Sequence, residues 1–175
     1  MKPEQLVFVD ESGTYLGMTR DNARSEAGQR AYGVKPTHPE NISLIAALSL
    51  QGVIAALLIP GPVNGEIFKG FVEKILVPVL KPGERVLMDN VPFHKVKGIK
   101  ELIKGAEAEL QSLPPYSPDF SPIENCFSKI KEALRGIGSK TFKTLVTDVK
   151  NALTDVSEED AHGWFHHCGY CIPAQ

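Results

Sequence analysis

The sequence lacks the features that would place it in a membrane or in an oxidising compartment. No apolar run among its 175 residues approaches the roughly 18 that a membrane span needs. Residues 1–6 do not resemble a secretory signal. Three cysteines, Cys126, Cys168 and Cys171, do not suggest a disulfide framework. We therefore expect a protein of the reducing cytoplasm without a membrane partner.

A strong overall charge is also absent. The net charge is −2, with 42% hydrophobic and 23% charged residues, which is ordinary for a globular protein of one domain. Basic residues nevertheless gather locally, with net charges of +2, +3 and +4 in residues 20–35, 95–104 and 129–150. Solvated helix faces and a phosphate-contacting surface explain such segments equally well.

Regular structure is excluded from much of the segment L-P-P-Y-S-P-D-F-S-P-I-E-N, residues 113–125, by its four prolines. The segment ends at a predicted helix start, with Ser121 as N-cap and Pro122 in the first helical position. Glu124 then has two interpretations. It either completes a capping box, S-x-x-E, or is a carboxylate that the rigid loop delivers to the edge of the core.

Hydrophobic patterns predict an α/β domain. Alternating helical and strand patterns favour a mixed sheet with helices on its faces. Residues 20–39 are predicted to form a long, largely irregular loop. We expect strands at residues 6–9, 14–18 (as a hairpin partner of the first), 41–50, 53–59, 85–88 and 108–113, and helices at 64–78, 92–104, 123–137, 142–153 and from Ser157 onward.

Three carboxylates lie at the ends of these elements. Asp10 follows the first strand, Asp89 follows the strand at 85–88, and Glu124 begins a helix. Strand ends on one edge of a sheet lie about 5 Å apart per neighbour, so the three can cluster. A cation would offset their repulsion, and oxygen ligands suit Mg²⁺ or Mn²⁺. Turn chemistry and capping remain the alternative explanations.

Three motifs extend this idea to a family: V-D-E-S-G around Asp10, M-D-N-V-P-F-H at residues 88–94, and the proline-rich segment ending at Asn125. They resemble the catalytic blocks of Tc/mariner DDE transposases. The 34 residues between Asp89 and Glu124 resemble the spacing of the bacterial insertion-sequence branch. G-Q-R at residues 28–30 is also similar, and the resemblance covers nearly the whole chain.

The resemblance implies a ribonuclease H-like fold with a mixed five-stranded sheet flanked by helices. It implies that Asp10, Asp89 and Glu124 hold two Mg²⁺ ions, for which Mn²⁺ can substitute. The implied reactions are DNA cleavage at transposon ends and transfer of the 3′-hydroxyl into target DNA at TA, in association with a bacterial nucleoid. Supporting roles fall to Asn90, His94 and Asn125.

The sequence departs from the family in two respects. Phe127 stands where members commonly carry tryptophan, a conservative change. The first catalytic strand begins within ten residues of Met1, where members carry helix-turn-helix modules. We therefore expect residues 1–175 to be a single catalytic domain, with the DNA-binding region absent or on a separate subunit, and we leave a homodimer open.

Other functions stay open or are disfavoured. The alternatives are a non-enzymatic remnant that binds DNA or a partner, and a ribonuclease H-like nuclease without strand transfer. H-H-C-x-x-C, residues 166–171, lacks a second ligand pair for zinc, and Cys126 has no catalytic triad around it. Residues expected to contact DNA phosphates are Arg24, Arg30, Lys95 and Lys97.

Overall fold

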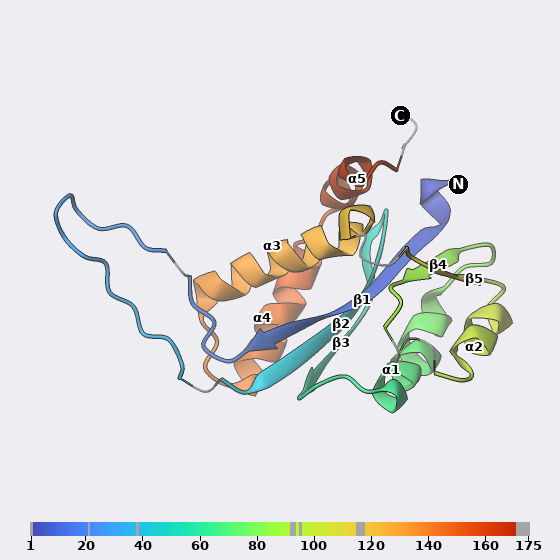
Figure 1. Ribbon diagram of the computed structural model, residues 1–175, viewed down its shortest axis with the longest axis horizontal. Helices are drawn as coiled ribbons and strands as arrows, with labels where there is room; N and C mark the ends of the chain where they lie inside the picture. The colour runs from blue at the N-terminus through green and yellow to red at the C-terminus, as the bar shows by residue number, and fades with distance from the viewer. Residues whose placement is uncertain are drawn as a thin grey trace.

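A mixed five-stranded sheet forms the centre of the molecule (Figure 1). The computed structural model describes residues 2–20, 22–37, 39–91, 94, 96–114 and 118–170. The strand order is β3-β2-β1-β4-β5. Strand β1 pairs antiparallel with β2 and parallel with β4, and β5 is parallel to β4. The strands are β1 (Leu6–Tyr15), β2 (Asn41–Ser49), β3 (Gly52–Pro60), β4 (Arg85–Met88) and β5 (Glu109–Ser112).

Strand β1 is longer than the sequence indicated. The expected turn at Ser12 and Gly13 does not form, and the predicted hairpin partner at residues 14–18 is wrong. Instead, β1 stays paired with β2 from Phe8 opposite Leu48 to Tyr15 opposite Asn41. The non-local partner supplies backbone hydrogen bonds along the whole segment, so the local turn signal is overridden. Asp10 consequently lies within a strand and not at its end.

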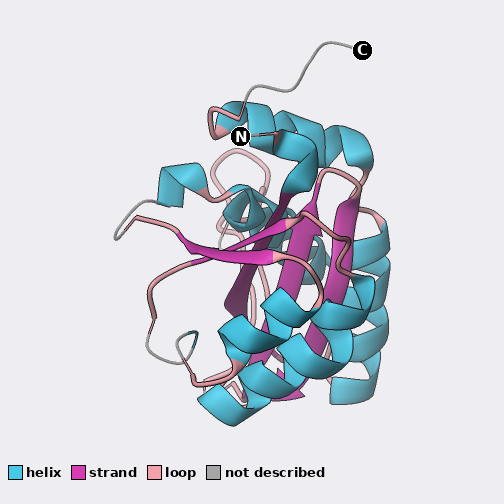
Figure 2. Ribbon diagram, turned by 90° about the vertical axis from the view of Figure 1, so that its right-hand side faces the viewer, coloured by secondary structure: helices cyan, strands magenta, loops and turns pink. Residues whose placement is uncertain are grey.

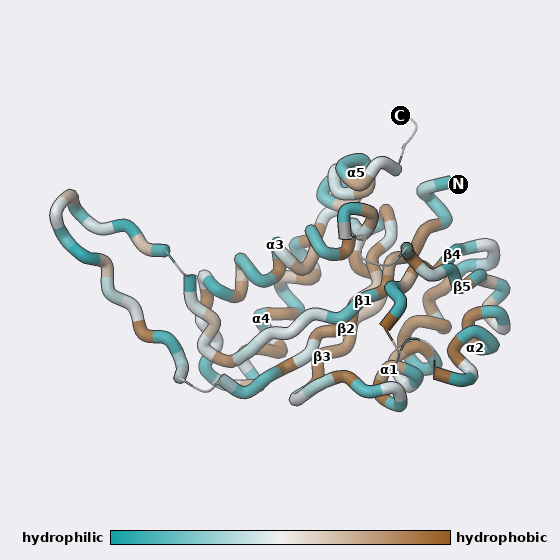
Figure 3. The backbone as a smooth tube through the Cα atoms, in the orientation of Figure 1, coloured by the Kyte–Doolittle hydropathy of each residue, from teal (hydrophilic) through white to brown (hydrophobic). Residues whose placement is uncertain are grey.

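Helices cover both faces of the sheet (Figure 2). On one face, α3 (Pro122–Ile137), α4 (Phe142–Thr154) and α5 (Glu158–His167) share a core with alternate residues of β1 such as Phe8. The other face is covered by α1 (Gly65–Phe71) and α2 (Ile99–Gly105), which pack on Val7 and Val9. Helix α1 continues through π and 3-10 turns to Val79 and packs on the same face. Figure 3 shows hydrophobic and hydrophilic residues alternating along the helices that flank the sheet.

Helix α2 begins later than predicted. The expected helix at 92–104 begins only at Ile99. Gly98 has a φ of +101°, a left-handed conformation that a right-handed helix does not contain. Pro92, Phe93 and Lys95 lie outside the described residues.

Residues 22–37 project from the domain as a long arm (Figure 1). Its described residues form no regular helix or strand, as predicted, and most are exposed. Tyr32 and Val34 are 89% and 88% exposed. Within the described part of the chain, no helix is both long and apolar enough to cross a bilayer.

Candidate active site

The register of β1 and β4 brings Asp10 and Asp89 together. The last parallel pair joins Val9 to Met88, so each aspartate is the next residue beyond that pair on neighbouring strands. Side chains alternate along a strand, so Asp10 lies on the same face as Phe8, which is the face that α3 covers. The predicted proximity of the two carboxylates is therefore present, although only β4 ends at this point.

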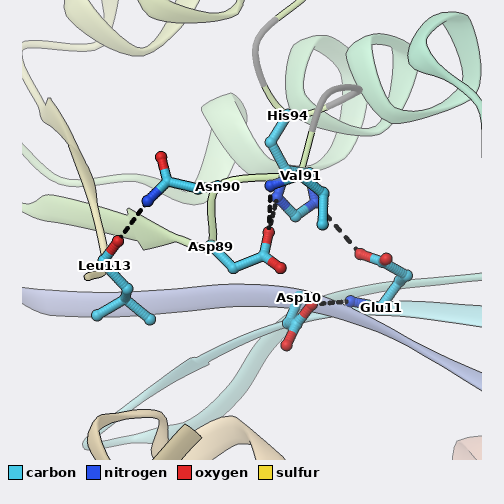
Figure 4. Close-up of polar contacts among 7 residues, drawn as sticks. All are labelled: Asp10, Glu11, Asp89, Asn90, Val91, His94 and Leu113. Atoms are coloured by element: carbon cyan, nitrogen blue, oxygen red, sulfur yellow. Dashed lines mark hydrogen bonds and ion pairs between the residues drawn. The ribbon is translucent and has the colours of Figure 1, made fainter. Parts of the chain in front are cut away.

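Each aspartate has one oxygen held and one available. Oδ1 of Asp10 accepts from the backbone N–H of Glu11 at 2.8 Å, and Oδ1 of Asp89 accepts from that of Val91 at 3.2 Å (Figure 4). Oδ2 of each makes no hydrogen bond to a described residue. One ligand atom each from Asp10, Asp89 and His94 lie within 4.8 Å of one another. The Asp10 and Asp89 carboxylates are therefore close enough to share a cation.

The carboxyl group of Asp10 titrates far above its ordinary range. Burial raises its pKa to about 7, and the negative charges of Glu11, Asp89 and Glu124 act in the same direction. The hydrogen bond from the Glu11 backbone opposes this rise. A carboxyl group whose charge is disfavoured in this way gains from a positive ligand.

His94 connects two acidic residues on opposite sides of its ring. Its Nε2 lies 3.2 Å from Oε2 of Glu11, and its Nδ1 lies 2.6 Å from Oδ1 of Asp89 (Figure 4). The side chain is 3% exposed and packs on Phe68 with ring centroids 4.2 Å apart. Burial alone would lower its pKa, but the hydrogen bond to Glu11 and the charges of Glu11, Asp89 and Asp10 outweigh burial and raise it above 6.5. A charged imidazolium fits this position, because Nε2 can donate to Glu11 while Nδ1 lies within ion-pair distance of the Asp89 carboxylate.

Glu124 lies in the first turn of α3 and is exposed. The Ser121 side chain makes no cap hydrogen bond, and no capping box is present. The backbone N–H of Glu124 donates to the carbonyl of Ser121 at 3.1 Å, but its carboxylate has no hydrogen bond or ion pair among the described residues. Its charge contributes to the raised pKa of Asp10. The carboxylate is therefore free to bind a ligand, although it is outside the 4.8 Å group formed by Asp10, Asp89 and His94.

The start of α3 is held from the C-terminal side. The hydroxyl of Tyr170 donates to the carbonyl of Phe120 at 2.8 Å, in the 3-10 turn Pro118–Phe120 that precedes α3. The Tyr170 ring packs on Phe8 of β1, with centroids 5.3 Å apart. Helix α3 is thus fixed to the strand that carries Asp10. Asn125 points elsewhere, because its amide approaches the sulfur of Cys168 at 4.0 Å.

The other predicted site residues are dispersed. Asn90 donates to the carbonyl of Leu113 at 2.6 Å and ties the segment after β4 to the start of the proline-rich segment (Figure 4). Lys97 lines a cavity of about 300 Å³ that also reaches Asp89 and His94. Arg24 and Arg30 lie on the exposed arm and are not brought to the carboxylates. Lys95 lies outside the described residues.

The donor set fits a hard divalent cation. Carboxylate oxygens are the ligands that Mg²⁺ and Mn²⁺ prefer, and an available oxygen remains on Asp10, Asp89 and Glu124. A thiol nucleophile fits less well, since burial raises the pKa of Cys126 to about 12. Of the residues suggested for zinc, Cys168 is buried and Cys171 lies outside the described residues.

Sequence reasoning missed Glu11. It directly follows Asp10, and on a strand adjacent residues point to opposite faces, so Glu11 points away from α3. That alternation was readable from V-D-E-S-G, but its partner His94 is 83 residues away, which no local pattern discloses.

Solved structures confirm the fold. A Mos1 mariner paired-end complex with Mn matches with a TM-score of 0.79 and 18% identity, over 95% of this chain and 53% of that one. A pre-cleavage Mos1 transpososome matches with a TM-score of 0.75, 17% identity and coverages of 95% and 53%. The catalytic domain of Mos1 mariner transposase matches with a TM-score of 0.69 and 17% identity, over 95% and 78%. The predicted ribonuclease H-like fold is therefore correct.

The chain spans about half the length of the Mos1 chains in those complexes. No curated protein matches it in sequence. A sequence family described as DDE superfamily endonuclease matches residues 5–146, which contain Asp10, Asp89 and Glu124. The chain is a member of the DDE superfamily endonuclease family.

Proposed function

We propose that this chain is the catalytic domain of a transposase that cuts DNA at transposon ends and transfers the freed 3′-hydroxyl into target DNA at a TA dinucleotide. The observation that carries the proposal is the meeting of Asp10 and Asp89 at the last β1–β4 pair, each with an available oxygen. Glu124 adds an uncapped carboxylate from the helix that covers the same face.

In this proposal Asp10, Asp89 and Glu124 hold two Mg²⁺ ions, which Mn²⁺ can replace. When bound, such ions activate a water or 3′-hydroxyl and stabilise the leaving oxygen in phosphodiester chemistry. The protein keeps Asp89 in place through the Val91 backbone, and Asn90 fixes the adjoining segment to Leu113.

DNA phosphates are the proposed partners of the arm and of the cavity rim. Arg24 and Arg30 have no carboxylate partner among the described residues, and Lys97 lies beside Asp89 at the cavity. Matched Mos1 structures include a paired-end complex with Mg and a strand transfer complex. A homodimer and a separate N-terminal DNA-binding subunit stay predictions.

A plasmid assay tests this function. Supercoiled plasmid and a labelled oligonucleotide with a free 3′-hydroxyl are incubated with the chain in Mg²⁺ or Mn²⁺, and nicked and joined products are separated. We expect both products from the wild type and neither from Asp89→Asn at an unchanged melting temperature. Asp119→Asn is the matched control, because this exposed aspartate lies close to Glu124 in sequence without being a proposed ligand.

The alternatives predict different products. Nicking without joining would indicate a nuclease that lacks strand transfer. Binding of DNA without either product would indicate a non-enzymatic protein. Equal activity of wild type and Asp89→Asn would overturn the assignment of the carboxylates.

A further inference from the structure

Residues Glu11, His94 and Asp89 form a continuous chain of contacts between β1 and the segment that follows β4. Glu11 comes from β1, Asp89 follows β4, and the His94 ring lies between their carboxylates (Figure 4). These contacts link two segments that are 83 residues apart in sequence. Asp89 therefore has a contact from β1, through His94, in addition to the hydrogen bond from Val91 of its own segment.

The ring has little freedom to rotate. His94 is 3% exposed and lies against Phe68, whose own side chain is fully buried. Glu11 Oε2 fixes the direction of Nε2 at 3.2 Å, and the opposite nitrogen must then face Asp89, where Nδ1 and Oδ1 are 2.6 Å apart. A buried ring held by an acceptor on one side is a rigid support for a group on its other side.

Asp89 is consequently held by one oxygen only. Both the Val91 N–H and His94 Nδ1 approach Oδ1, while Figure 4 shows the other oxygen turned away from the ring. A partial rotation of the carboxylate about χ2 would lengthen both contacts, and a half-turn would only exchange two equivalent oxygens, so one oxygen stays held in either case. The arrangement therefore keeps Oδ2 available beside Asp10.

We propose that Glu11 and His94 are positioning residues: Glu11 orients the His94 ring, and the ring fixes the Asp89 carboxylate for cation binding. This inference rests on the proposed function only in requiring a divalent cation at Asp89. Outer contacts of this kind change metal affinity by about 10- to 100-fold in proteins. Glu11 acts through His94 and touches neither the cation nor DNA.

The experiment measures Mn²⁺ binding by the 175-residue chain, with MnCl2 as probe and the paramagnetic resonance signal of free Mn²⁺ as readout. We expect Glu11→Gln and His94→Phe each to weaken binding about 10-fold. The double variant should bind no more weakly than His94→Phe alone, because the two residues act in series. Glu109→Gln is the control, since it removes the same charge from an exposed ion pair between Glu109 of β5 and Arg85 of β4.

A conservative variant separates geometry from charge. Glu11→Asp keeps the charge but shortens the side chain by one methylene, so it should lose contact with Nε2 and bind as weakly as Glu11→Gln. Binding by Glu11→Asp equal to wild type would mean that Glu11 acts by charge alone and would overturn the inference. So would a further 10-fold loss on adding Glu11→Gln to His94→Phe, which would make Glu11 a direct ligand.

Folding is checked by melting in EDTA. If His94→Phe does not fold, His94→Gln, which also removes the ring, replaces it in the cycle. Wild-type binding with an unchanged midpoint in Glu11→Gln would overturn this inference and leave the proposed function standing. Failure of the wild type to bind Mn²⁺ would overturn both.

Discussion

Two helices of this protein begin with the same sequence pattern, and only one of them uses it for capping. Helix α5 begins at Ser157, whose hydroxyl accepts from the Asp160 N–H while the Asp160 carboxylate accepts from the Ser157 backbone at 2.9 Å. Helix α3 begins at Ser121 with Glu124 in the equivalent position, yet neither half of the box forms. Ser121 has a ψ of 90°, against 164° at Ser157, and is 6% exposed.

The difference in capping means that the Asp160 carboxylate stabilises its helix, whereas the Glu124 carboxylate is available to a ligand. Asp160 also forms a hydrogen-bonded ion pair with Lys129. The hydrogen bonds from Lys129 and from the Ser157 backbone lower the pKa of Asp160. Glu124 has no such partners and instead adds to the negative field at Asp10. A capping box would have engaged the Glu124 carboxylate at its own helix, and without one the exposed carboxylate is available to a ligand.

Exchanging these two carboxylates for amides should break function in one case only. If Glu124 binds the proposed cation, Glu124→Gln removes a charge worth several kcal/mol to the transition state, so DNA cutting should fall about 1,000-fold. Its melting temperature should stay within a degree or so of wild type, because no hydrogen bond of the side chain is lost. Initial nicking rates in Mg²⁺ and melting curves in EDTA measure the two effects.

Asp160→Asn is the matched variant and should leave the nicking rate unchanged. If Glu124→Gln instead lowered the melting temperature as much as Asp160→Asn while keeping its activity, Glu124 would be a helix cap and the contrast would disappear.

Asp10→Asn should stabilise the protein in the absence of divalent cations. The folded-state pKa of Asp10 is about 7, above the ordinary 3.8, so its contribution to stability is full below pH 4 and is lost as pH rises toward 7. Asparagine does not ionise, so the variant should gain on the wild type across that window, by on the order of 1–3 kcal/mol above pH 7. Urea unfolding in EDTA at pH 4, 6 and 8 measures the gain. A gain that is equal at all three pH values would contradict the raised pKa.

The sequence predicted most of this fold because many of its signals are local. The stripe from Ile123 to Leu134 predicted α3, and the runs that became β2 to β5 were recognised within a few residues. The hairpin at Gly13 was wrong because ten residues of β1 are fixed by pairing with β2, which a local turn signal cannot reveal.

The sequence named the candidate residues but did not indicate the contacts between them. Asp10 and Asp89 were recognised from their motifs, while their proximity depends on the pairing of Val9 with Met88. Glu11 was missed because its contact with His94 joins residues that are 83 positions apart in the sequence. Glu124 shows the limit most clearly, since S-x-x-E permits two structures and only the backbone angle at Ser121 distinguishes them.

Asp160→Asn should weaken the folded state by about 1 kcal/mol at neutral pH, since it removes a capping interaction and an ion pair with Lys129. The pKa of Asp160 is lowered by folding, so its stabilisation is present above pH 4 and is lost as pH falls below its folded value. The difference between wild type and variant should therefore shrink in acid. Thermal melting from pH 7 to pH 2.5 follows it, and a difference that grew in acid would be incompatible with this ion pair.

The basic side chains should also divide into those held by an ion pair within the protein and those available to bind DNA. Lys129 is committed to Asp160 and to the carbonyl of Asp155 at 2.9 Å, whereas Arg24 and Arg30 have no carboxylate partner among the described residues. If the two arginines contact DNA phosphates, Arg24→Ala with Arg30→Ala should reduce the slope of log K against log salt by about 1.8, or 0.9 for each phosphate. Lys129→Gln should lower the melting temperature and leave that slope unchanged. Fluorescence anisotropy with a duplex at several NaCl concentrations gives the slopes.

Equal slopes for wild type and the double arginine variant would remove the arm from the DNA interface. A reduced slope for Lys129→Gln would show that an ion-paired lysine still contributes to DNA binding.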